Sequence, residues 1–199
     1  MNKIIKENET LLICSHNEGK INEFKILLKP FNINTKSASD LGLSEPEETG
    51  KTFEENSILK AKHGLTSGLT VIADDSGLCV SSLDGAPGIY SARWAKRYGG
   101  WVNSMQEIYD RVSQQQQQNF DAKFCCSISI AFQSDEIYSY YGEIKGKISW
   151  PPRGTNGFGY DPFFVADNQK NTFGEMKHLI KVQMDHRSIA FNKMIKKHL

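Results

Sequence analysis

Apolar and polar residues recur along the chain with two different periods, and each period predicts a different kind of element. Strict alternation from residue 124 to residue 132 predicts a strand, because successive side chains of a strand point to opposite faces. The apolar face of this strand is expected to carry Phe124, Cys126, Ile128, Ile130 and Phe132. Shorter apolar runs predict further strands at residues 11–15, 71–73, 78–80, 137–144 and 163–165.

Apolar residues three or four positions apart predict helices. One such stripe precedes Pro30, and a second helix opens at Thr52, which has capping-box spacing with Glu55. We expect further helices at residues 101–112 and from about residue 187 onward. Because strands and helices follow one another without a regular βαβ repeat, the order predicts an α/β fold with a mixed sheet.

Composition narrows the class of protein. With 199 residues, of which 39% are apolar and 24% charged, the chain fits a soluble globular domain, either simple or two-lobed. A formal net charge of +1 provides no overall field for nucleic acid or a membrane, so we expect neither partner. The N-terminus has no signal-peptide pattern, and the four cysteines form no Cys-x-x-Cys pair, which favours a cytoplasmic protein.

The first candidate for chemistry is the turn between the predicted strand at 11–15 and the helix after it. The turn reads Ser-His-Asn-Glu-Gly-Lys and ends at Lys20. Free backbone N–H groups and the positive end of the helix would attract a phosphate, and Lys20 would add a full charge. The spacing is not that of a P-loop, and an ordinary turn with a solvated lysine is the alternative.

A pair of acidic residues follows the predicted strand at 71–73, in the sequence Asp74-Asp75-Ser76-Gly77. Neighbouring carboxylates are costly unless a cation compensates them, paired oxygen ligands suit Mg²⁺, and one carboxylate could activate water. Glu47 or Glu48 in an acidic loop could complete a metal site, and Lys60 could reach a phosphate. The alternatives are a turn made of turn-forming residues and a solvated acidic loop.

Two later segments have the composition of a base-binding site. Residues 157–162, Gly-Phe-Gly-Tyr-Asp-Pro, combine glycines that permit close approach with rings that can stack on a nucleobase. Lys181 and Arg187 only donate hydrogen bonds, so they favour a base edge with carbonyl acceptors, such as the 6-oxo group of inosine and xanthine. The alternatives are a hairpin with its aromatic rings in the core and a charged helix start at the surface.

Together these segments resemble the inosine triphosphate pyrophosphatase family, which removes deaminated purine nucleotides. The match covers residues 11–194 and rests on SHNEGKINEF, EETGKTFEENSILKAKH, ADDSGLCVSSLDGAPGIYSARWA, TNGFGYDPFF and a late His-Arg pair, in this order. The resemblance implies an elongated mixed β-sheet with flanking helices and two lobes around a central nucleotide cleft. It further implies a homodimer of a single domain, residues 1–199, in which residues 1–10 are an N-terminal extension that we interpret as solvated chain.

The activity that the resemblance implies is the Mg²⁺-dependent hydrolysis of ITP, dITP and XTP to the nucleoside monophosphate and pyrophosphate. Asp75 would activate water and bind Mg²⁺ together with Glu47, while Lys20 and Lys60 would assist catalysis. Asp74 would support the same site. The residues expected to bind substrate are Ser15, His16, Asn17, Glu18, Gly19, Lys20, Ser76, Phe158, Gly159, Tyr160, Asp161, Lys181, His186 and Arg187. Of these, Tyr160 would stack on the base, and Lys181, His186 and Arg187 would read its 6-oxo group.

Three positions depart from the family pattern. His16 stands where a small residue is frequent, Asp185 where Ser is usual and Ser188 where Gly is usual. Because Asp185 precedes the base-reading pair, its charge could alter base selectivity.

Other hypotheses are a pyrophosphatase for modified pyrimidine or methylated nucleotides, a nucleotide sensor without chemistry and a nucleic-acid-binding module. The late basic residues argue against the first, the intact lysines and carboxylates against the second, and the near-neutral net charge against the third.

Overall fold

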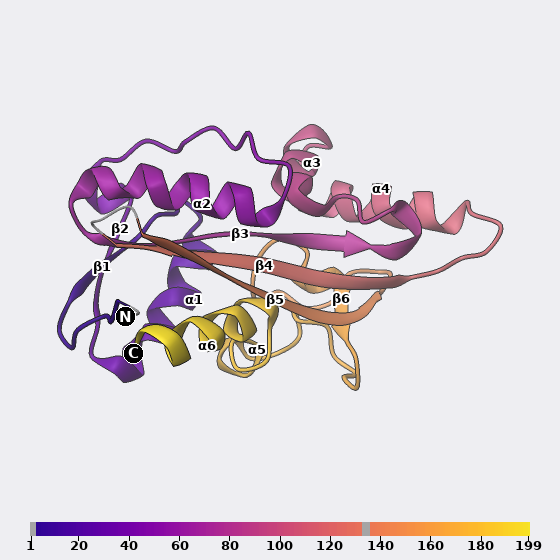
Figure 1. Cartoon of the computed structure of the whole chain (residues 1–199). Helices are drawn as coiled ribbons and strands as arrows, with labels where there is room; N and C mark the ends of the chain where they lie inside the picture. Colours follow the sequence, from indigo (N-terminus) through magenta and orange to yellow (C-terminus); the bar gives the residue numbers. More distant parts are fainter. Residues whose placement is uncertain (1–2, 133–135) are drawn as a thin grey trace. The chain divides into compact units, whose positions relative to one another are not determined.

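The computed structural model of the chain describes residues 3–132 and 136–199 (Figure 1). Its strands form one six-stranded sheet in the order β2-β1-β3-β4-β5-β6. Strand β1 pairs in parallel with β2 and β3, whereas β5 pairs antiparallel with β6, so the sheet is mixed. The strands are β1 (Thr10–Ile13), β2 (Asn34–Ser37), β3 (Thr70–Val80), β4 (Asp121–Ala131), β5 (Ile137–Ile148) and β6 (Phe164–Ala166).

Helices accompany the sheet, and the predicted α/β class with a mixed sheet is confirmed. In the described residues the α-helices are α1 (Glu18–Leu28), α2 (Phe53–Gly64), α3 (Ser91–Arg97), α4 (Trp101–Ser113), α5 (His178–Lys181) and α6 (His186–His198). The hydroxyl of Thr52 accepts a hydrogen bond from the backbone N–H of Glu55 at 3.1 Å, as the capping pattern predicts. The two short strands predicted at 71–73 and 78–80 are parts of one long strand, β3.

The chain divides into two compact units, and strands β3, β4 and β5 contribute residues to both. The first unit comprises Met1–Asp75, Cys126–Gly142 and Arg187–Leu199, and the second comprises Ser76–Cys125 and Glu143–His186. Each unit has hydrophobic clusters of its own. The assignment of all 199 residues to a single domain stays a prediction.

In the first unit, the two faces of the sheet are covered by different helices (Figure 1). Ile128 and Ile130 of β4 share a cluster with Phe24 of α1 and with residues of α6. On the other face, Ala61 of α2 packs with Val71 of β3. The alternation predicted for β4 is therefore confirmed, and successive residues of a strand in this unit meet different helices.

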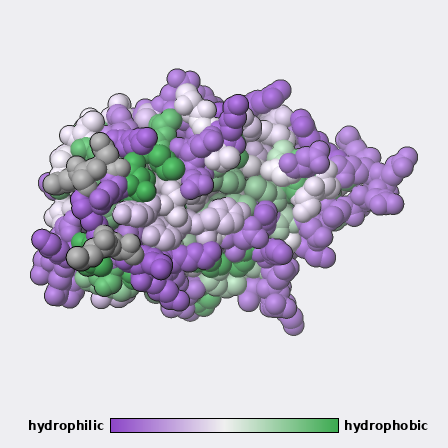
Figure 2. All heavy atoms as spheres, in the orientation of Figure 1, coloured by the Kyte–Doolittle hydropathy of each residue, from purple (hydrophilic) through white to green (hydrophobic). Residues whose placement is uncertain are grey.

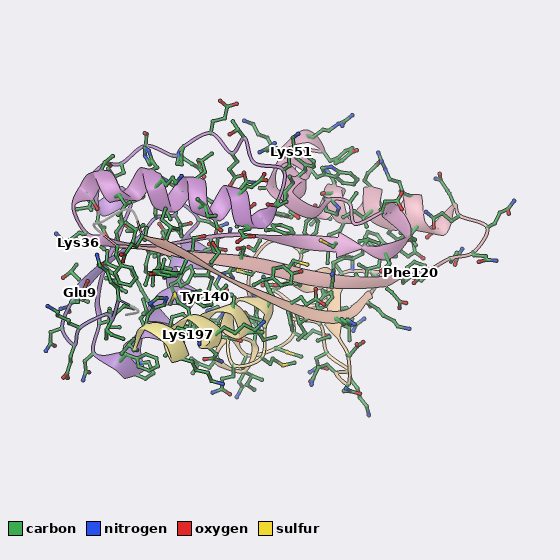
Figure 3. All side chains as sticks on the ribbon, in the orientation of Figure 1. Glu9, Lys36, Lys51, Phe120, Tyr140 and Lys197 are labelled. Atoms are coloured by element: carbon green, nitrogen blue, oxygen red, sulfur yellow. The ribbon has the colours of Figure 1, made fainter. Side chains whose placement is uncertain are left out.

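Within residues 3–10, Lys3 and Ile5 contact the end of α6, which corrects the interpretation that this segment is only solvated chain. Ile5 is only 2% exposed, and its N–H donates to the carbonyl of His198 at 2.7 Å. The ring of His198 lies between the carbonyl of Lys3, 2.7 Å from Nδ1, and the hydroxyl of Tyr140, 2.6 Å from Nε2. Figure 3 labels Tyr140 on β5. These contacts join Lys3 and Ile5 to the end of α6 within the first unit.

The second unit has a core rich in aromatic residues, in which Phe163 and Phe164 pack with Ile108 of α4 and Leu78 of β3.

Most of the surface visible in Figure 2 is hydrophilic, with apolar residues in small patches. No helix among the described residues is long and apolar enough to cross a membrane.

Candidate functional site

The predicted phosphate turn lies between β1 and α1 and is built by its own side chains. Asn17 caps α1 by accepting the N–H of Lys20 at 3.2 Å, and the hydroxyl of Ser15 accepts the N–H of Asn17 at 3.1 Å. The ring of His16 contacts the carbonyl of Leu43, 2.8 Å from Nε2. Since these groups shape the turn, the backbone around the exposed Glu18 and the half-buried Gly19 remains as the anion-attracting helix start.

Asp74 and Asp75 follow one another in β3, so their carboxylates meet different helices. Asp74 faces α1 and α6, where its Oδ2 lies 3.1 Å from Nζ of Lys20 and 2.9 Å from Nη2 of Arg187. Asp75 faces α2, where its Oδ1 lies 3.5 Å from Nζ of Lys60. The two carboxylates therefore have different cations as their nearest partners, and they are 1% and 4% exposed.

The two carboxyl groups have opposite pKa shifts. Burial alone would raise the pKa of Asp74, but Lys20, Arg187 and Lys60 outweigh it and hold that pKa well below its usual range. For Asp75 burial prevails over the nearby lysines, so its pKa lies above the usual value. The structure thus keeps Asp74 ionised and makes Asp75 the better proton acceptor of the two.

Lys60 lies among acidic groups of the first unit. Its Nζ is 2.8 Å from Oε1 of Glu48 in addition to its contact with Asp75. Burial would lower the pKa of Lys60, but the charges of Asp75, Asp74 and Glu48 raise it, so the ammonium stays charged. Glu48 therefore lies at the carboxylate cluster, whereas the side chain of Glu47 is exposed; a metal-binding role of Glu47 stays a prediction.

Asn56 orients Asp75, a role that the sequence pattern did not assign. Its Nδ2 donates to Oδ2 of Asp75 at 3.0 Å, and its Oδ1 accepts the N–H of Gly50 at 2.8 Å. Asn56 is completely buried at the start of α2. An amide one turn into a capped helix, beside a predicted carboxylate site, is the signal that could have identified it.

Three of the predicted base-binding residues, Phe158, Asp161 and Lys181, form a second cluster, in the second unit. Nζ of Lys181 lies 2.7 Å from Oδ2 of Asp161, and both side chains are at most 3% exposed. The same oxygen accepts the N–H of Phe158 at 2.8 Å, and the ammonium of Lys181 lies 4.8 Å from the centre of the Phe158 ring. This arrangement joins a directional donor to a half-buried aromatic face.

Tyr160 does not offer the stacking face that was expected. Its side chain is 2% exposed, its hydroxyl lies 2.6 Å from Oγ of Ser104, and its ring meets Trp101 edge to face. Burial raises the pKa of Tyr160 to about 12. Because the ring is part of the core, Phe158 replaces it as the stacking candidate; Gly159 between them has a positive φ of 64°.

The residues of the late basic segment lie in different units. His186 stacks on Phe124 in the second unit, with 4.8 Å between ring centres, and the N–H of Asp185 donates to the carbonyl of Lys181 at 3.0 Å. Arg187 belongs to the first unit, where its fully buried guanidinium donates to Glu23 and Asp74. Because this guanidinium is already bound to two carboxylates, the structure does not support base reading by the Arg187 side chain.

Ser76, the remaining predicted contact, is half-buried on β3 at the first position of the second unit.

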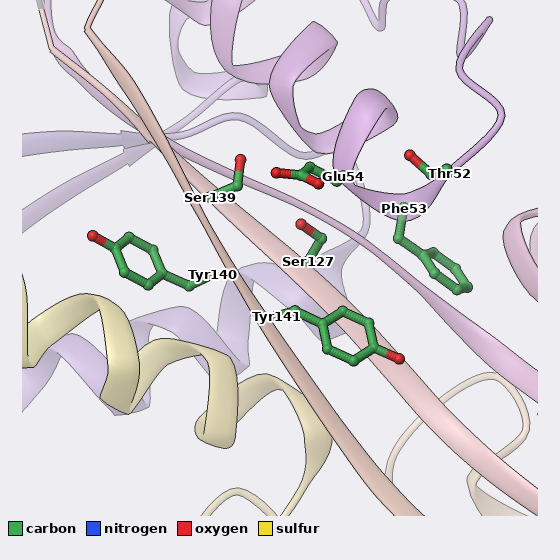
Figure 4. A pocket seen from close by; sticks show the side chains of 7 residues that line it. All are labelled: Thr52, Phe53, Glu54, Ser127, Ser139, Tyr140 and Tyr141. Atoms are coloured by element: carbon green, nitrogen blue, oxygen red, sulfur yellow. The ribbon is translucent and has the colours of Figure 1, made fainter.

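A separate pocket of about 260 Å³ opens beside the start of α2 (Figure 4). It is lined by Thr52, Phe53, Glu54, Ser127, Ser139, Tyr140 and Tyr141. Because this lining includes no lysine or arginine, the pocket is a poor site for a triphosphate.

Comparison with known proteins connects this geometry to a family. The family model described as the Ham1 family matches residues 11–197. The dITP/XTP pyrophosphatase of Agrobacterium fabrum is 41% identical, with 95% of each chain covered, and that of Zymomonas mobilis is 41% identical over 93% of this chain and 90% of the relative. The structure of a HAM1 protein from Coxiella burnetii superposes with a TM-score of 0.85 at 31% identity, covering 94% of this chain and 97% of that one.

Replacing Gly157 by Ala is expected to disrupt the second cluster. Gly157 has a φ of +74°, and an added Cβ would collide with Oδ2 of Asp161. Gly42 has a similar φ of +63° but open space around it, so Gly42→Ala measures the backbone strain alone, about 1–2 kcal/mol. Gly157→Ala should cost at least about 3 kcal/mol, since it also disturbs a buried ion pair. Urea unfolding measures both; equal costs would show that the Asp161 contact is unimportant.

Proposed function

The chain belongs to the Ham1 family, and on this basis we propose that it hydrolyses deaminated purine nucleoside triphosphates, such as dITP, ITP and XTP, to the nucleoside monophosphate and pyrophosphate. The observation that carries the proposal is the pair of buried carboxylates, Asp74 and Asp75, each held by a lysine. Ionised lysines beside a proton-accepting carboxylate are the groups that hydrolysis of a phosphoanhydride requires.

In this reaction Asp75 accepts the proton of the attacking water. Asn56 fixes the orientation of its buried carboxylate, as a general base requires. The triphosphate is bound by the backbone of the turn from Ser15 to Lys20, by the ammonium of Lys20 and by Lys60. The two ammonium groups stabilise the negative charge that develops on the leaving pyrophosphate.

The carboxylates fit a divalent cation. Burial and the charge of Glu48 both raise the pKa of Asp75, which means that its ionised form is destabilised. A cation bound beside it would compensate this destabilisation. Mg²⁺ needs few protein ligands, because this ion keeps several waters and takes oxygens from substrate phosphates. Asp75, with Glu47 or Glu48, would hold Mg²⁺, which supplies Lewis-acid stabilisation of the phosphate charge.

Base selection is assigned to the second cluster. The ammonium of Lys181 can only donate, so it matches the 6-oxo group of hypoxanthine and xanthine and mismatches the amino group of adenine. The ring of Phe158 would stack on the base, and Asp161 orients Lys181. His186 remains a candidate for a further contact with the base.

The homodimer and the cytoplasmic location stay predictions. Analytical ultracentrifugation would test the homodimer.

Pyrophosphate release with Mg²⁺ should be fastest from dITP, ITP and XTP when these are compared with ATP, GTP, methylated and pyrimidine triphosphates. The expected preference over ATP is about 10⁴-fold in kcat/KM, because a mismatched donor leaves buried polar groups unpaired. Removal of the metal with EDTA should abolish release. A preference for a modified pyrimidine would retain the chemistry and reject the base assignment, and a folded protein that hydrolyses none of them would be a sensor.

Asp75→Asn should lower kcat by about 10²–10⁴-fold, since it removes the general base while keeping the size of the side chain. The matched control is Asp121→Asn, because the side chain of Asp121 is 57% exposed at the surface. Pyrophosphate release measures both variants, and thermal unfolding checks that Asp75→Asn remains folded. Turnover close to that of the control would exclude Asp75 as the base.

Asp185→Ser should change the ratio of kcat/KM between ITP and GTP. Asp185 is 1% exposed and directly precedes His186, so it places a buried acidic side chain within the segment that is expected to read the base. The same pyrophosphate assay gives the ratio. Identical ratios in the two proteins would show that Asp185 takes no part in base selection.

A further inference from the structure

Helix α1 buries a charged residue to which neither the family resemblance nor the proposed reaction gives a role. Glu23 lies three residues after Lys20, and its side chain has no exposed surface. The neighbouring buried residues of α1, Ile21, Phe24 and Leu28, belong to the hydrophobic core. A carboxylate at such a position is costly to bury, and it persists only if it is paired.

The partner of Glu23 is the guanidinium of Arg187, which is equally buried. One nitrogen of this guanidinium, Nη1, donates to Glu23, and the other, Nη2, donates to Oδ2 of Asp74 at 2.9 Å. The same oxygen of Asp74 lies 3.1 Å from Nζ of Lys20. Four charges of alternating sign therefore form one chain, Glu23–Arg187–Asp74–Lys20, which begins and ends on α1.

Stability alone gives little reason for such a chain, because buried ion pairs are often replaceable by apolar residues at no cost. The geometry of the Arg187 guanidinium gives a better reason for this chain of charges. A planar guanidinium held at both ends cannot rotate, so the position of its Nη2 is fixed relative to α1. Asp74 is thereby held at one place, and the flexible side chain of Lys20 is directed to it.

We propose that Glu23 is a positioning residue: through Arg187 and Asp74 it sets the place of the Lys20 ammonium that binds the substrate phosphates. The inference rests on the proposed function, in which Lys20 contacts the triphosphate. It gives Arg187 a role as the link between Glu23 and Asp74. Without the charge of Glu23, the guanidinium would turn wholly to Asp74 and compete with Lys20 for the same carboxylate oxygen.

The test is a double-mutant cycle of Glu23→Gln and Lys20→Met, read by the affinity for inorganic tripolyphosphate in calorimetry with Mg²⁺ present and by kcat and KM for ITP. Each single variant should weaken tripolyphosphate binding by about tenfold, the loss of roughly one charge-assisted hydrogen bond. The double variant should be no weaker than Lys20→Met alone, because both changes remove the same positioned ammonium. A structural role of Glu23 would instead give additive losses, and that result would overturn the proposal.

A matched control is Glu107→Gln, which breaks an exposed pair between Glu107 and Arg111 and should leave affinity and turnover unchanged. If Glu23→Gln does not fold, the paired change Glu23→Met with Arg187→Met removes both charges together. That variant should bind tripolyphosphate about tenfold more weakly than the wild type and be insensitive to Lys20→Met. Unchanged affinity would overturn the proposal.

The tripolyphosphate measurement also separates the two claims. If the wild type binds tripolyphosphate but hydrolyses no nucleotide, the proposed reaction fails, and the cycle of affinities still decides the role of Glu23. If the wild type does not bind tripolyphosphate at all, the positioning role is rejected as well.

Discussion

The buried charge of Asp74 is the constraint on which the first unit depends. A carboxylate without solvent contact is tolerated only where cations surround it, and Lys20 and Arg187 provide them. These residues come from β3, α1 and α6, and Arg187 is 113 positions from Asp74 in sequence. Burial of one carboxylate therefore brings the C-terminal helix and the first helix to the same point of the sheet, where the candidate chemistry lies.

Strand geometry then gives the two adjacent aspartates different surroundings and different roles. Because neighbouring side chains of a strand point to opposite faces, Asp74 meets fixed cations on one face while Asp75 meets Lys60 and Asn56 on the other. The pKa of Asp74 falls and that of Asp75 rises. Two identical residue types, one position apart, thus become a permanent counter-ion for Lys20 and a candidate base. The sheet achieves this without a special backbone conformation.

Sequence patterns predicted those parts of this arrangement that depend on residues close together in the chain. Alternation identified β4, the capping box located α2, and the paired aspartates marked the carboxylate site. The sequence could not show that Arg187 would turn to Glu23, 164 positions away, since no periodicity links two residues at that separation. For the same reason the burial of the Tyr160 ring escaped prediction: glycines beside an aromatic residue permit a ligand or a core equally well.

Charge balance explains why the carboxylate site and a metal belong together. The first-unit cluster holds the carboxylates of Glu23, Glu48, Asp74 and Asp75 against the three cations of Lys20, Lys60 and Arg187. With one carboxylate in excess, this cluster by itself has no net attraction for a polyanion. A divalent cation reverses the sign, so a triphosphate would enter such a site as its Mg²⁺ complex. The excess of acid over base thereby favours a metal–nucleotide complex over the free nucleotide.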